Sequence, residues 1–128
     1  ATTEIYTLSL HDALPISDRE GTARRYAAAW NAVVVLKGAR TVAAAPDGRV
    51  LVNPTGNPGL ARGGSGDVLS GMTAALLACG LPAFEAAACA VYLHGAAADR
   101  AAAKHGEYGM LPHDILPELG RLFAERQR

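Results

Sequence analysis

The residues best suited to chemistry form the run Gly63-Gly64-Ser65-Gly66-Asp67, which leads directly into an apolar stretch with helical spacing. Glycines in this position let several backbone N–H groups converge on one point, and a helix start adds about half a positive charge there. The run therefore predicts an anion hole formed by Gly63, Gly64, Ser65 and Gly66. It matches neither the Walker A pattern GxxxxGK[ST] nor the dinucleotide pattern GxGxxG that directly follows a strand.

Asp67 ends this run and has two interpretations. A carboxylate beside a phosphate repels it, so Asp67 is poorly placed as a simple anion ligand. It is well placed as a general base for a hydroxyl that attacks the phosphate. Alternatively, Asp67 only stabilises the start of the helix, as aspartate often does. The residue types alone leave both interpretations open.

A strand must end close to these glycines if they are to form a ligand site. Val33–Leu36 is an uninterrupted apolar run, typical of a strand buried on both faces of a parallel sheet, and Lys37-Gly38 follows it. Because α/β folds bind ligands at the carboxyl ends of strands, Lys37 is a candidate contact, although it could also be a solvated boundary residue. Residues 41–45 and 50–52 flank Pro46-Asp47-Gly48, which predicts a β-hairpin.

Helical periodicity appears in four stretches. The first begins at Asp18 or Thr22 and ends near Trp30, with Ala23, Tyr26, Ala27 and Trp30 on one face; the others cover residues 68–79, 82–104 and a stretch from about 114. Residues 53–59 are too rich in proline and glycine for a regular element, and Asn57 is expected to form an Asx-turn there rather than to contact a nucleotide. His94 is expected to be a hydrogen-bonded core histidine rather than a catalyst.

Composition narrows the class of protein. The chain has 128 residues, 50% of them hydrophobic, and 12 basic residues against 12 acidic ones, so its formal net charge is zero. This balance offers no clustered basic excess for nucleic acid or for a membrane surface, so neither is an expected partner. Cys79 and Cys89 lie in alanine-rich stretches without a CxxC spacing, and we predict reduced core thiols and a cytoplasmic location.

The first sixteen residues, ATTEIYTLSLHDALPI, differ in character from the rest. They resemble the translation of the universal adapter ligated to fragments for short-read sequencing, which encodes all sixteen residues in order. We therefore expect residues 1–16 to be a non-native segment and set them aside in predicting the fold. Residues 17–128 are then expected to be the C-terminal fragment of a longer protein.

The segments VVVLKGARTV and NPTGNPGLARGGSGDVLSG resemble the C-terminal half of the ADP/ATP-dependent NAD(P)H-hydrate dehydratases, which belong to the ribokinase-like superfamily. The likeness covers about Tyr26 to Leu119, with LKGxxT, GNPG, GGSGD and YLHG in order. It implies the C-terminal part of a ribokinase-like α/β/α fold, with a buried strand, a β-hairpin and three to four helices. It also implies an ADP-dependent enzyme that phosphorylates the ring hydroxyl of hydrated NADH or NADPH. Phosphate then leaves by elimination, which gives NAD(P)H and AMP.

The resemblance also assigns residues. Gly66 matches a nucleotide contact, and Asp67 matches a carboxylate that touches the hydrated nicotinamide, so Asp67 is the expected catalytic base. Leu60 and Arg62 replace the methionine and threonine expected before the glycines; Arg62 adds a cation beside the phosphates and leaves the choice between ADP and ATP open. Mg²⁺ is an expected cofactor because phosphoryl transfer usually recruits it, although the sequence shows no metal ligands. The segment that matches the contact with the AMP portion consists of Lys37, Gly38, Ala39, Arg40 and Thr41.

Two other hypotheses remain. The protein could be another ribokinase-like kinase for a small alcohol such as a vitamin precursor. The chain could also be a non-functional fragment, because Val33–Leu36 without neighbouring strands would expose an unpaired apolar edge. We expect residues 17–128 alone to show no dehydratase activity, and the full-length protein to form a homo-oligomer.

Overall fold

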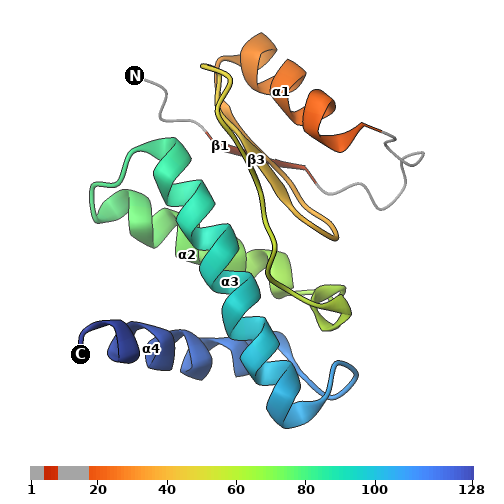
Figure 1. Cartoon of the computed structure of the whole chain (residues 1–128), viewed down its shortest axis with the longest axis vertical. Coiled ribbons are helices and arrows are strands. Elements are labelled where there is room, and N and C mark those ends of the chain that lie inside the picture. The colour runs from red at the N-terminus through yellow and green to blue at the C-terminus, as the bar shows by residue number, and fades with distance from the viewer. Residues whose placement is uncertain (1–4, 9–17) are drawn as a thin grey trace.

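The computed structural model describes residues 5–8 and 18–128, and Figure 1 shows their arrangement. Two short 3₁₀ turns, Pro58–Leu60 and Pro112–Asp114, precede the second and fourth helices. In chain order the strands and α-helices are β1 (Ile5–Leu8), α1 (Arg19–Trp30), β2 (Val33–Leu36), β3 (Val42–Ala44), β4 (Val50–Val52), α2 (Ser65–Ala78), α3 (Ala83–His105) and α4 (Ile115–Arg126).

The strands form one mixed sheet in the order β1-β2-β3-β4. β1 pairs with β2 in parallel, and the other two pairs are antiparallel. All four residues of β2 are buried, which confirms the prediction of a strand covered on both faces. The predicted hairpin is β3–β4: Gly48 at its turn has a φ of +95°, and its amide donates to the carbonyl of Ala45 at 3.1 Å.

Helices cover both faces of the sheet, α1 on one and α2 with α3 on the other (Figure 1). Alternation along β2 explains this, because Val34 and Leu36 pack with Ala23 and Ala27 of α1, whereas Val33 and Val35 point to the other helices. Each buried valine or leucine among them contributes about 1.5–3 kcal/mol. The predicted α/β/α arrangement is confirmed.

Several details differ from the expectations. Ala23 and Ala27 of α1 are fully buried, but Tyr26 and Trp30 are 37% and 42% exposed, so the buried stripe of α1 is narrower than predicted. Helix α2 begins at Ser65 rather than at residue 68, because the glycine run itself turns into the helix.

The prediction of core thiols is wrong. Cys79 and Cys89 are both exposed. Cys79 follows the last residue of α2, where the chain turns toward α3, and Cys89 lies on the outer side of α3 beside the buried Ala86, Ala87 and Ala90. The buried contact between these helices is formed by Leu69 and Met72 of α2 with alanines, Val91 and Leu93 of α3, and not by the cysteines.

The prediction of an unpaired edge on β2 is also wrong. β1 lies beside β2 in register, with Ile5 opposite Val33 and Leu8 opposite Leu36, so the main chain of β2 has a partner on both sides. Four of the sixteen residues that we predicted to be non-native thus form a strand, and the other twelve lie outside the described residues. Among the described helices, none is both long enough and apolar enough to cross a membrane.

Candidate functional site

A cleft of about 820 Å³ lies at the carboxyl end of β2, where α2 begins and the loop after β4 passes along α3. It brings together parts of the chain that are far apart in sequence. Most residues singled out from the sequence line it, namely Lys37, Gly38, Ala39, Arg40, Thr41, Leu60, Arg62, Gly63, Ser65 and Gly66.

The charge of this cleft has one sign. Its lining includes the cations Arg19, Lys37, Arg40 and Arg62, and no carboxylate is among the lining residues that the structure describes. The chain as a whole is neutral, and four of its 12 basic residues line this one cleft. Such a cavity favours an anion that carries several negative charges.

Lys37 and Gly66 meet inside the cleft. Lys37 follows the last residue of β2 and is half-buried, and Gly66 is in the first turn of α2. A Cβ added to Gly66 would lie 2.6 Å from the Nζ atom of Lys37. The ammonium therefore lies against the helix N-terminus, where the backbone also attracts negative charge. Lys37 therefore lies beside the helix N-terminus, a position that fits the predicted contact with an anionic ligand.

The turn after β2 is held in two ways. The hydroxyl of Thr41 donates to the carbonyl of Gly38 at 3.0 Å, and Arg40 adopts a left-handed conformation with a φ of +57°. Arg19, from the first turn of α1, donates from Nη2 to the carbonyls of Leu36 and Lys37, both at 3.0 Å. Sequence reasoning missed Arg19, because nothing in its spacing shows that the helix start lies over the end of β2.

The structure brings three of the four residues of the predicted anion hole to the cleft. Gly63, Ser65 and Gly66 line the cleft, but Gly64 does not. Gly64 has a φ of +95°, and a Cβ there would lie 3.3 Å from Pro112, so this glycine serves the turn into α2. The amide of Ser65 is directed to the carbonyl of Arg62 at 3.3 Å, whereas the amide of Gly66 has no backbone partner among the described residues.

Asp67 is in the first turn of α2, next to Gly66, and its side chain is exposed. It is not among the described residues that line the cleft. Its amide donates to the carbonyl of Gly64 at 3.1 Å, as at an ordinary helix start. Both roles considered for Asp67 are compatible with this exposed position beside Gly66.

The loop of residues 53–59 forms one wall of the cleft and is fastened to α3. Buried Asn53 donates from Nδ2 to the carbonyl of Val91 at 3.2 Å, and the hydroxyl of Thr55 lies 2.9 Å from the carbonyl of Tyr92. The side chain of Asn57 accepts from the amide of Gly59 at 3.0 Å, which confirms the predicted Asx-turn.

His94 lies on the floor of the cleft and is only 7% exposed. Burial lowers the pKa of its imidazole, the Ser65 backbone raises it, and the charge of Lys37 lowers it further. Its Nε2 atom has no hydrogen-bond partner among the described residues. His94 is therefore buried as predicted but is not a fully hydrogen-bonded core histidine.

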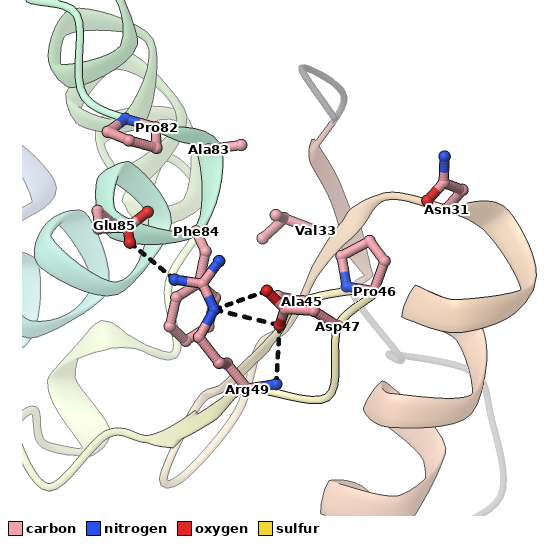
Figure 2. Close-up of a pocket in the computed structure, with 10 residues that line it drawn as sticks. All are labelled: Asn31, Val33, Ala45, Pro46, Asp47, Arg49, Pro82, Ala83, Phe84 and Glu85. Carbon is pink, nitrogen blue, oxygen red and sulfur yellow. Dashed lines mark hydrogen bonds and ion pairs between the residues drawn. The ribbon is translucent and has the colours of Figure 1, made fainter. Parts of the chain in front are cut away.

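A second cavity of about 490 Å³ lies at the other end of the sheet, near the start of β2 and the hairpin turn. Figure 2 shows Arg49 at its centre: the guanidinium donates to Asp47 at 2.9 Å and to Glu85 at 2.7 Å, and it lies 4.7 Å from the centre of the Phe84 ring. Because the charges of this cavity are paired with each other, it resembles a structural link between the hairpin and α3 rather than an anion site.

Metal ligands are not gathered anywhere in the described part of the chain, where no group of three or more His, Cys, Asp or Glu side chains could hold an ion. The cleft lining also lacks a carboxylate there. The described residues thus offer no side-chain cage for Mg²⁺, which usually binds through one or two carboxylates together with the phosphates of a substrate.

Comparisons with known proteins agree with this geometry. The family model described as NAD(P)H-hydrate dehydratase matches residues 7–121. A bifunctional NAD(P)H-hydrate repair enzyme from Moorella thermoacetica is 56% identical over 99 residues, which are 77% of this chain and 19% of that protein. An ADP-dependent (S)-NAD(P)H-hydrate dehydratase from Neisseria meningitidis is 48% identical over 102 residues, which are 79% of this chain and 34% of that protein.

A solved structure is similar as well. The ADP/ATP-dependent NAD(P)H-hydrate dehydratase from Bacillus subtilis, co-crystallised with ATP and Mg²⁺, has a TM-score of 0.79 and 42% identity, and the match covers 84% of this chain and 39% of that one. A ribokinase-like superfamily protein from Enterococcus faecalis has a TM-score of 0.72 and 36% identity, over 82% of this chain and 36% of that one. The chain thus spans less than half the length of each of these relatives.

Proposed function

This chain belongs to the NAD(P)H-hydrate dehydratase family, and we propose that it supplies the nucleotide-binding part of an ADP-dependent enzyme that converts hydrated NADH or NADPH back to NAD(P)H. Its fold is the C-terminal part of the ribokinase-like α/β/α fold. In this reaction a phosphoryl group moves from ADP to the ring hydroxyl, and phosphate then leaves by elimination, so AMP and phosphate are the other products.

The observation that carries the proposal is the position of Lys37. Its ammonium lies against Gly66 at the N-terminus of α2, in a cleft that four cations line. A terminal phosphoryl group placed there would be held by the ammonium and by the amide of Gly66, and its developing charge would be stabilised as it is transferred. A neutral substrate would leave these charges without a partner.

We also assign roles in binding and catalysis to the other residues predicted from the sequence. The segment 37–41 contacts the AMP portion, and Arg62, whose guanidinium donates to the carbonyl of Tyr108, adds positive charge at the rim. Asp67 is the base that removes the proton from the attacking ring hydroxyl, since its carboxylate is exposed beside Gly66. Either ADP or ATP fits the cationic lining.

The test is direct binding of ADP to the purified chain, followed by an assay with hydrated NADH. We expect calorimetry to show ADP binding that weakens as salt is raised, because the cleft acts through charge. We expect residues 17–128 alone to give no turnover, because they correspond to less than half the length of the relatives. Absence of ADP binding at low salt would refute the proposal.

A kinase for a small alcohol is the second candidate, favoured by the likeness to the ribokinase-like protein from Enterococcus faecalis. The two reactions leave different products. A dehydratase yields AMP and restores the absorbance of NADH, whereas a kinase leaves a stable phosphorylated alcohol. A protein of the relatives' length that carries this segment, incubated with ADP and hydrated NADH, distinguishes them.

A further inference from the structure

Asp99, on α3, holds the loop wall of the cleft with both oxygens of its carboxylate. Oδ2 accepts a hydrogen bond from the amide of Gly56 at 3.0 Å, and Oδ1 accepts one from Nδ2 of Asn57 at 2.9 Å. Gly56 and Asn57 line the cleft, but Asp99 is not among its lining residues in the described structure. Asp99 therefore acts on the cleft only through the loop.

The second of these bonds continues through Asn57. While its NH₂ group donates to Asp99, its Oδ1 atom accepts from the amide of Gly59 at 3.0 Å. An amide side chain has one donating and one accepting end, so these two partners fix which way it points. Asp99, Asn57 and Gly59 thus form a relay in which each donor faces an acceptor.

Close packing allows Asp99 to reach this loop. Gly95 lies one turn earlier on α3, and a Cβ there would be 2.9 Å from the amide nitrogen of Gly56. Only glycine lets the helix approach the loop backbone so closely. Figure 1 shows the chain after β4 passing beside α3 at this point.

We propose that Asp99 is a positioning residue for the nucleotide: its carboxylate sets the orientation of Asn57 and the course of residues 56–59, and so the shape of the wall that the nucleotide contacts. This inference rests on the proposed function. Asp99 makes no contact with the nucleotide itself. It acts because hydrogen bonds to a charged group are about twice as strong as neutral ones and hold a loop in one geometry.

The variant Asp99→Asn tests the relay, because the new amide has only one accepting end for two donors. One donor of the loop, the Gly56 amide or the Asn57 NH₂ group, must then face another donor. We expect the Kd for ADP to rise roughly five- to tenfold, the effect of one lost charged hydrogen bond. Simple electrostatics predicts the opposite sign, since removing a negative charge near a cationic cleft would strengthen ADP binding.

The swap of both residues is the decisive variant. In Asn57→Asp alone, two carboxylates face each other, and ADP binding should also weaken. In the double variant Asp99→Asn with Asn57→Asp, the carboxylate at position 57 accepts from Gly59 and from the new amide, which in turn accepts from Gly56. Every donor again faces an acceptor, so we expect the double variant to bind ADP better than either single variant. In the double-mutant cycle, the coupling energy should therefore have the opposite sign to the losses of the single variants.

Asp47→Asn is the matched control, because Asp47 also accepts from a main-chain amide, that of Arg49 at 3.1 Å, but lies at the other end of the sheet. It should leave ADP binding unchanged. Hydrogen exchange of the Gly59 amide should be faster in both single variants and slow again in the double variant, a pattern that a general loss of stability would not produce.

Each outcome is decisive. Unchanged or tighter ADP binding in Asp99→Asn, or no recovery in the double variant, overturns the role of Asp99 while the proposed function stands. Failure of the unaltered chain to bind ADP overturns both. Weaker binding in each single variant with recovery in the double variant supports the relay.

Discussion

The ammonium of Lys37 lies against Gly66, although one residue follows a strand and the other is in the first turn of a helix. A Cβ at position 66 would lie 2.6 Å from Nζ, so any larger residue there would make the end of the lysine side chain shift. This arrangement places a side-chain cation beside a helix N-terminus, and both attract negative charge.

Gly66→Ala should therefore shift the flexible end of Lys37 and raise the Kd for ADP by about two- to fivefold, because the ammonium moves aside but stays in the cleft. Gly71→Ala is the matched control: it lies on the same helix, and a Cβ there meets nothing within 4 Å. Both substitutions stabilise the helix by roughly 0.5–1 kcal/mol, so helix stability alone cannot explain a difference in ADP affinity between the two variants. Calorimetric titration with ADP measures it, and equal affinities would contradict the assigned contact.

Arg19→Met should loosen the turn after β2, because its guanidinium donates to the carbonyls of Leu36 and Lys37. We expect a loss of about 1–3 kcal/mol in the free energy of unfolding together with weaker ADP binding. Arg25→Met, on an exposed position of the same helix, serves as the control. Urea unfolding gives the stability. A stable Arg19 variant with unchanged ADP binding would show that the turn needs no such support.

The buried imidazole of His94 should make the fold sensitive to mild acid. Its pKa in the folded chain is below the ordinary 6.5, chiefly because of burial. At a pH between the pKa of the folded chain and 6.5, the unfolded chain binds more protons than the folded one. The free energy of unfolding therefore falls as the pH drops through 6.5, and it stops falling below the folded pKa. Nuclear magnetic resonance should show a midpoint below 6.5 for His94. His94→Asn should remove this part of the pH dependence of urea unfolding, whereas the exposed His113→Asn should not.

Asp67→Ala separates catalysis from binding. In a protein of the relatives' length that carries this segment, turnover of hydrated NADH should fall by about 10²–10⁴-fold, the usual contribution of a general base. ADP affinity should not weaken, because the variant removes a negative charge near the phosphates. An undiminished turnover rate would leave Asp67 with only the role of starting α2.

Sequence patterns predicted the strands and α-helices that follow residue 17, but not β1, which lies in the segment set aside as non-native. The uninterrupted run Val33–Leu36 could only be a strand covered on both faces, and Pro46-Asp47-Gly48 could only turn the chain between two strands, because these are local consequences of side-chain shape and backbone freedom. The family motifs also identified the segment 37–41 and the glycine run, most of which the cleft contains.

Tertiary structure decided which side chains meet. Arg19 and Asp99 carry no motif, and their partners lie 17 to 43 residues away in the chain, so no spacing could place them at the cleft. The same holds for the exposure of Cys79 and Cys89, since apolar neighbours in sequence do not tell which side of a helix is covered. Periodicity determines how a segment folds by itself, whereas the packing of α1 and α3 around one sheet determines what each residue touches.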